Sequence, residues 1–332
     1  MFARCTLALS VLAAAGCVQE TGLSSFETDD VWYQAESNEI DILFVVDDSC
    51  SMAEEQGILA DGMLDFANEL DVSGTDFHLG VITTSFDYDD PDRGRLVGTP
   101  AYLTPEDDYV REFAERVHVG IDGSDKEKGL EAAIHALSVD MQNTLNLGFI
   151  RVAAKLLVVF VSDEDDCSDY GTLEGTAPSA CYLRGDDLMP LEAAVGLLRL
   201  SKSDDNMITV GAIVGPESGR CQDSHWGRRY QEVVRQMGGR NGNICDSDWG
   251  SLMYDLGLNA SGVVESFRLG HAAQLGTLEV YVDEERVDED RLNGWTYEPT
   301  TWYLAFHGAS VPPRGSQIRA HYTVAPGDQP SL

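Results

Sequence analysis

The chain has 332 residues, of which 57 are acidic and 22 are basic, and its formal net charge is -35 at pH 7. Apolar residues make up 43% and charged residues 24%, an ordinary globular mixture that argues against wholesale disorder. A surface this acidic repels phosphate backbones and no basic stripe interrupts it, so we expect no nucleic-acid partner. The length favours two domains.

The chain begins with a predicted export signal. Residues 1–16 combine one arginine, an apolar stretch too short to span a bilayer and small residues before Cys17. The stretch Ala14-Ala15-Gly16-Cys17 resembles the lipobox of bacterial lipoproteins. This resemblance implies lipidation of Cys17 and anchoring in the bacterial cell envelope, at the outer membrane or cell surface, with membrane contact through the lipid only. Cleavage after Ala15 would instead give a secreted protein.

Residues 17–36 show little periodicity and are predicted to be a tether. From residue 37 to 261, short apolar runs typical of buried strands alternate with stripes typical of amphipathic helices. The predicted strands cover residues 40–46, 77–84, 156–161 and 208–214, with a short additional strand considered over 95–103. The predicted helices cover residues 59–70, 105–117, 130–137, 191–200, 229–237 and 249–258. This alternation predicts an α/β domain with a doubly wound, mostly parallel sheet.

The pattern changes in the last part of the chain. Over residues 262–325 apolar side chains recur at every second position, with turn residues between the runs and no helical stripe. We expect a small antiparallel β-module there, followed by a tail over residues 326–332. The module is near the lower size limit for independent folding and should therefore lean on the α/β domain.

The cysteines agree with export, because disulfides persist in oxidising compartments. Cys167 and Cys181 bracket one polar insertion, and Cys221 and Cys245 bracket another, so these four are disulfide candidates in two local pairs. Cys50 is left over. The absence of any CxxC pair or neighbouring histidine at ligand spacing argues against a zinc site.

The strongest candidate site follows the first buried strand. Asp47, Ser49 and Ser51 alternate in a turn that leads into a helix. Such hard oxygen ligands suit Mg²⁺, Ca²⁺ or Mn²⁺. Ligands bind beyond the carboxyl ends of parallel strands, so further oxygens should come from the loops at 123–125 and 162–163. A helix N-cap is the alternative interpretation, because serine and aspartate are favoured there.

This arrangement resembles the von Willebrand factor type A (vWA) domain over roughly residues 37–261. The metal-ion-dependent adhesion site (MIDAS) of that family combines an Asp-x-Ser-x-Ser loop, a threonine from a second loop and an aspartate after the fourth strand. Asp47, Ser49 and Ser51 match the first element, and Asp163 matches the last.

The second element of the family pattern is imperfect in this chain. Ser124 stands where the family has its threonine, and Asp125 and Glu127 are alternatives to it. The resemblance implies a Rossmann-like fold and a cation, Mg²⁺ or else Ca²⁺ or Mn²⁺, that takes a carboxylate oxygen from a partner protein.

The sequence therefore predicts an envelope-anchored adhesion or scaffold module that binds a protein partner through a divalent cation, without catalysis. The first alternative is a metal-dependent hydrolase acting on phosphoesters in the same oxygen-rich pocket. It lacks a visible base or basic phosphate clamp, and its acidic rim would repel anionic substrates. The second alternative is a structural vWA fold that binds no metal.

Overall fold

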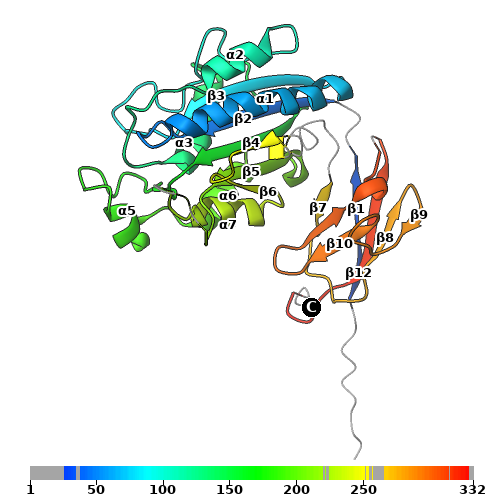
Figure 1. Cartoon of the computed structure of the whole chain (residues 1–332). Coiled ribbons are helices and arrows are strands. Elements are labelled where there is room, and N and C mark those ends of the chain that lie inside the picture. The colour runs from blue at the N-terminus through cyan, green and yellow to red at the C-terminus, as the bar shows by residue number, and fades with distance from the viewer. Residues whose placement is uncertain are drawn as a thin grey trace, which may run out of the picture.

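The computed structural model describes residues 26–34, 38–219, 221, 224–250, 252–253, 256, 265–313 and 315–328. The predicted signal peptide, the lipidation candidate Cys17 and part of the predicted helix 249–258 lie outside these residues. Within them, an α/β part and a smaller all-β module stand next to each other (Figure 1). No helix in the described ranges is long and apolar enough to cross a bilayer.

A five-stranded parallel sheet in the order β3-β2-β4-β5-β6 forms the centre of the α/β part. Its strands are β2 (Glu39–Val46), β3 (Asp76–Thr83), β4 (Lys155–Ser162), β5 (Ile208–Val214) and β6 (Arg240–Asn243). Strand β4 is buried along its whole length, and β2 in all but its first residue. Continuous apolar runs are required there because helices cover both faces of the sheet.

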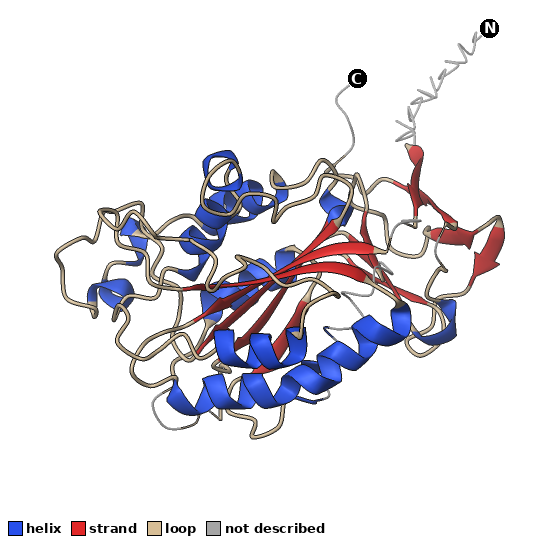
Figure 2. Cartoon of the chain, turned by 90° about the horizontal axis from the view of Figure 1, so that it is seen from above, coloured by secondary structure: helices blue, strands red, loops and turns tan. Residues whose placement is uncertain are grey.

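The helices divide between the two faces, as Figure 2 shows. The long helix α1 (Ala53–Ser73) and α2 (Tyr109–Arg116) pack on one face, where Phe66 and Phe113 contact Phe44 of β2. The opposite face is covered by α3 (Gly129–Ala136), α6 (Leu191–Arg199) and α7 (Arg228–Gln236). Short helical turns complete this part: α4 (Val139–Gln142), α5 (Ala180–Leu183), η1 (Gly185–Asp187) and η2 (Asp205–Met207).

The predicted mixed α/β architecture is confirmed, with the four predicted strands in the parallel sheet. The additional strand considered over 95–103 is reduced to one antiparallel bridge between Leu79 and Leu103 beside the edge strand β3. The predicted helix 105–117 begins later, at Tyr109.

The module contains two antiparallel sheets, β1-β12-β8-β9 and β10-β11-β7. Its elements are β1 (Glu27–Tyr33), β7 (Ser266–Arg268), β8 (Glu279–Val282), β9 (Glu285–Val287), β10 (Trp295–Glu298), β11 (Tyr303–Phe306), η3 (Gly308–Ser310) and β12 (Gln317–Thr323). Phe267 and Phe306 pack edge to face in its core. The prediction of a small antiparallel module is confirmed for residues 265–324.

The prediction of a tether over residues 17–36 is wrong for residues 27–33, which form strand β1. Residues 27–33 pair with β12 along their whole length, from Glu27 opposite Thr323 to Tyr33 opposite Gln317 (Figure 1, the blue strand among the orange and red ones). The side chain of Trp32 points inward against Phe267, at 5.4 Å between ring centroids. Other apolar side chains of β1 point outward, so the two faces of this strand are not distinguished by hydrophobicity and the two-residue period is hidden.

The module lies against the amino-terminal edge of the central sheet. A small cavity at the junction is lined by Ile40, Lys155 and Ile208 from the starts of β2, β4 and β5, and by Glu265 and Tyr303 from the module. The carboxyl ends of the parallel strands therefore lie at the opposite edge, away from the module (Figure 1). That opposite edge carries the candidate site.

Candidate metal centre

Asp47 is the first residue after β2 and is fully buried. Its backbone N–H donates to the Val161 carbonyl at 2.9 Å, which continues the pairing with β4 by one step. The two carboxylate oxygens accept hydrogen bonds from the Ser49 N–H at 2.8 Å and from the Ser162 hydroxyl at 2.6 Å. Burial raises the pKa of Asp47 to about 6, although these hydrogen bonds act in the opposite direction. Asp47 is thus a buried acid, and the groups that donate hydrogen bonds to its carboxylate are uncharged.

Ser49 and Ser51 present neighbouring hydroxyl groups, with 3.3 Å between their Oγ atoms. They do not cap the following helix: α1 begins at Ala53, its N-cap is Met52, and no side chain caps it. The structure therefore argues against the N-cap interpretation of this segment. Both hydroxyl groups can act as oxygen ligands.

Asp163 follows β4 directly, and because β2 and β4 are parallel neighbours it meets the Asp47 loop at the same sheet edge. Its side chain is only 3% exposed, and its Oδ1 atom is buried without a hydrogen-bond partner. Burial and then the charge of Asp47 raise the pKa of Asp163 to about 7, and a hydrogen bond with Ser51 acts against this rise. The structure thus brings Asp47, Ser51 and Asp163 together.

The second predicted loop is also held at this edge. The Gly123 N–H donates to the Asp48 carbonyl at 2.8 Å, and the Ser124 N–H donates to the Ser85 hydroxyl at 2.8 Å. The Ser124 hydroxyl itself accepts a hydrogen bond from the Lys126 N–H at 3.2 Å, within its own turn. The loop therefore lies at the predicted edge of the sheet, while the hydroxyl group of Ser124 makes its hydrogen bond within the loop.

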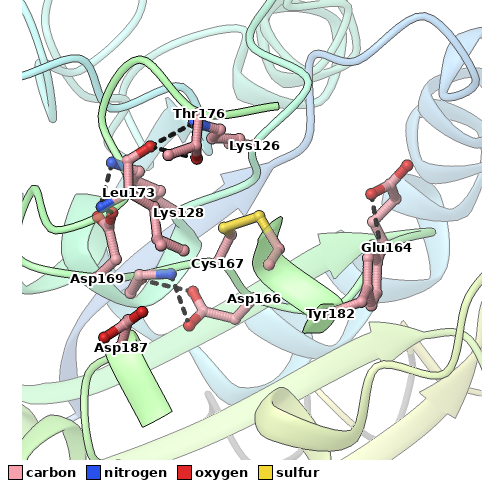
Figure 3. Close-up of a disulfide and its surroundings, with 12 residues drawn as sticks. Lys126, Lys128, Glu164, Asp166, Cys167, Asp169, Leu173, Thr176, Tyr182 and Asp187 are labelled. Atoms are coloured by element: carbon pink, nitrogen blue, oxygen red, sulfur yellow. Dashed lines mark hydrogen bonds and ion pairs between the residues drawn. A yellow bond between two sulfur atoms is a disulfide. The ribbon is translucent and has the colours of Figure 1, made fainter. Parts of the chain in front are cut away.

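Glu127 and Glu164 complete a group of acids around Asp47 that the sequence analysis did not assemble. Burial, followed by the charges of Asp47 and Glu164, raises the pKa of Glu127 to about 10. The Oε1 atom of Glu127 is buried without a partner. Glu164 accepts a hydrogen bond from the Tyr182 hydroxyl at 2.9 Å (Figure 3). The sequence offered Glu127 only as an alternative to Ser124, because a glutamate in a polar loop carries no burial signal.

The charge of this acidic group is not balanced by neighbouring cations. Among the described ion pairs, only His225 reaches one of the four acids, at 4.0 Å from Glu164, and none involves Asp47, Glu127 or Asp163. No three His, Cys, Asp or Glu side chains in the described ranges form a preformed metal cage. The serine hydroxyls and unpartnered carboxylate oxygens are nevertheless the hard donors that Mg²⁺, Ca²⁺ and Mn²⁺ take, so the residues present fit such a cation.

The loop after β4 is held firmly beside this group (Figure 3). Cys167 and Cys181 form one disulfide, and Cys221 and Cys245 form another, as predicted. A buried ion pair at 2.8 Å joins Lys128 to Asp169 next to the first disulfide. The thiol of Cys50 is free and exposed at the tip of the Asp47 loop.

A second buried ion pair also holds this loop, between Asp166 and Arg229 of α7 at 3.1 Å. These contacts fix the backbone that carries Asp163, so the position of its side chain does not depend on a mobile loop.

Comparison with known proteins found no matching family model and no matching curated protein sequence. Among solved structures, the pilus adhesin SpaC from Lactobacillus rhamnosus GG aligns at 13% identity with a TM-score of 0.41, over 92% of this chain and 42% of that chain. A von Willebrand factor type A protein from Catenulispora acidiphila aligns at 11% identity with a TM-score of 0.37, over 92% and 67% of the two chains. The pilus adhesin RrgA from Streptococcus pneumoniae aligns at 9% identity with a TM-score of 0.36, over 92% of this chain and 60% of that chain. The chain spans less than half the length of SpaC.

Proposed function

We propose that this protein is a cell-envelope module with a doubly wound vWA-type domain that binds a protein partner through a divalent cation. Asp47, Ser49, Ser51 and Asp163 would hold the cation, with the loop of Ser124 beside them. The observation that carries the proposal is the buried, unpartnered Oδ1 atom of Asp163 among acids without a basic partner. Burying an ionised carboxylate costs several kcal/mol unless it is paired or coordinates a metal, and a bound cation would offset this cost for the acids at the site.

The chemistry follows from the donor set. Ser49 and Ser51 offer neutral oxygens, and their short side chains leave the outer side of the site open to a partner. A bound divalent cation supplies a Lewis-acidic centre that can accept a carboxylate oxygen from the partner protein. Asp47 orients the loop through the Ser49 N–H and the Ser162 hydroxyl, which accounts for its complete burial.

The position of the site suits a role in binding. The chain enters the described structure through β1 in the module, which contacts the amino-terminal edge of the central sheet. The site lies at the other edge, so the α/β part separates it from the side on which a lipid at Cys17 would hold the protein. We therefore propose that the module is a pedestal that presents the site away from the membrane.

We propose a non-catalytic role because the nearby basic groups are already engaged. The Lys126 Nζ atom donates to the Leu173 carbonyl at 2.7 Å, and the Lys128 Nζ atom pairs with Asp169 at 2.8 Å. Neither is free to clamp a phosphoester, the substrate of the hydrolase alternative.

Calorimetric titration of Mg²⁺, Ca²⁺ and Mn²⁺ tests the proposal. Wild type should show one saturable site that is absent in Asp47→Asn and retained in Glu115→Gln. The second variant removes one exposed acid from α2 and so controls for diffuse binding to an acidic surface. Equal binding by all three proteins would contradict the assignment. Where binding is saturable, capture of envelope proteins with cation but not with EDTA tests for the partner.

A further inference from the structure

Strand β1 is an edge of the module: among the described strands, only β12 pairs with it. Backbone N–H and C=O groups alternate in direction along an antiparallel strand. At even-numbered positions they point to β12, because the Gln34 N–H donates to the Ser316 carbonyl and the Val324 N–H donates to the Phe26 carbonyl, both at 2.8 Å. The groups that point away from β12, and that accept or donate no hydrogen bond within the described ranges, are those of Glu27, Asp29, Val31 and Tyr33.

This free edge is long and accessible. All seven residues of β1 are exposed or half-buried, and the apolar Val31 and Tyr33 are 44% and 69% exposed. An open strand edge is a template for pairing with another chain, and native proteins often block it with charged side chains. Here the central acid, Asp29, is already paired within its own sheet, at 3.4 Å from the Arg319 guanidinium and 3.2 Å from His321 Nδ1. The edge therefore presents unpaired backbone groups beside exposed apolar side chains.

We propose that β1 pairs with β1 of a second copy of this chain, antiparallel and centred on Val31. This register is self-complementary: it sets the two Val31 side chains against each other, and Tyr33 against the partner's Asp29. A centre at Asp29 or Asp30 would place like carboxylates directly opposite each other, which is destabilising. A centre at Trp32 would leave only two of the four outward positions of β1 paired. The sequence of the strand thus selects both the partner and the register.

The pairing joins two four-stranded sheets into one continuous sheet and needs no cation, so it goes beyond the proposed function. Strand β1 runs from the start of the described chain toward the α/β part (Figure 1). Antiparallel pairing therefore points the two α/β parts in opposite directions. For copies anchored through Cys17, such a pair would join two facing surfaces. Two copies with a net charge of -35 each repel one another, so salt should strengthen the pairing, whereas it would weaken the binding of a basic partner.

The test is sedimentation equilibrium of the full chain in EDTA, at about 0.1 M and about 1 M NaCl, where the screening length falls from about 10 Å to about 3 Å. Val31→Pro removes the outward N–H and keeps the hydrogen bonds to β12, as proline at a strand edge can. Val31→Lys leaves the backbone unchanged and sets two like charges against each other. Thermal melts verify that both variants fold. The register is tested by mild oxidation of Val31→Cys and of the control Asp29→Cys, with wild type as the background for the natural thiols.

Wild type should be a monomer–dimer equilibrium that shifts toward dimer in high salt. Val31→Pro should weaken it at least about tenfold, because both hydrogen bonds at the symmetry axis are lost, and Val31→Lys about fivefold. Val31→Cys should form a disulfide-linked dimer, because its Cα atoms lie about 5.5 Å apart, whereas the Asp29→Cys positions lie roughly 13 Å apart along the strands. A wild type that is monomeric throughout, or association that salt weakens, overturns the inference. Equal dimerisation by Val31→Lys, or equal cross-linking by Asp29→Cys, also overturns it.

Discussion

Replacing Asp163 by asparagine should stabilise the metal-free protein, and increasingly so as the pH rises. The folded-state pKa of Asp163 is raised from 3.8 to about 7, so the folded state binds this proton more tightly than the unfolded state does. The stabilisation that Asp163 contributes by binding its proton in the folded state is therefore fully present below pH 3.8 and is lost as the pH rises through 7. At about 1.4 kcal/mol for each pKa unit, full ionisation costs the folded state about 4 kcal/mol. Between pH 5 and pH 8 the cost grows by about 2–3 kcal/mol.

The assay is urea denaturation in EDTA at pH 5 and at pH 8, for wild type, Asp163→Asn and the control Asp186→Asn, which changes an exposed acid in the same insertion. The advantage of Asp163→Asn over wild type should grow by about 2–3 kcal/mol between the two pH values. Asp186→Asn should follow wild type. A cation at 100 times its dissociation constant should raise wild-type stability by about 3 kcal/mol and raise that of Asp163→Asn less. A pH-independent difference below about 0.5 kcal/mol would refute the view of Asp163 as an uncompensated buried acid.

Three further changes test the surrounding framework. Replacing Cys167 and Cys181 by serine should lower the unfolding free energy by about 3 kcal/mol in urea titration, the cost of a loop of about 15 residues, and an unchanged midpoint would contradict this. Asp41→Ala should cost about 3–5 kcal/mol, because Asp41 is buried and pairs with Arg151 at 2.8 Å; a loss below about 1 kcal/mol would show that the pair contributes little. Deleting residues 26–34 should lower amide-exchange protection at the β12 amides that face β1, but not in β2, and unchanged protection at those amides would contradict the role of β1 as a partner of β12.

Much of the α/β part could be predicted because its strands are continuous apolar runs. The runs in β2 and β4 are buried between helices on both faces, so nearly every residue in them must be apolar, and the sequence displays this directly. The two disulfides could also be predicted, because each pair brackets one insertion. Strand β1 could not, because the outward Val31 and Tyr33 on one face and the inward Trp32 on the other cancel the alternation that marks a half-buried strand.

At the site, the positions that follow buried strands could be predicted residue by residue, whereas the second loop could be predicted only as a segment at the same sheet edge. Asp47 and Asp163 follow β2 and β4 immediately, so the parallel pairing of these strands brings them together. The second loop belongs to no strand, and its position depends on hydrogen bonds such as that from the Gly123 N–H to the Asp48 carbonyl. Spacing pointed to Ser124, whereas only the structure shows that the Ser124 hydroxyl accepts the Lys126 N–H and that the Oε1 atom of Glu127 is buried without a partner.

The most direct test of the central claim is anomalous diffraction from crystals of the protein soaked in Mn²⁺. The proposed function predicts one strong peak within ligand distance of the Ser49 and Ser51 hydroxyls, beside Asp163, and its disappearance in Asp47→Asn crystals soaked in the same way. Peaks confined to exposed carboxylates, with no density between the loops after β2 and β4, would contradict the claim that this sheet edge is a cation-dependent binding site.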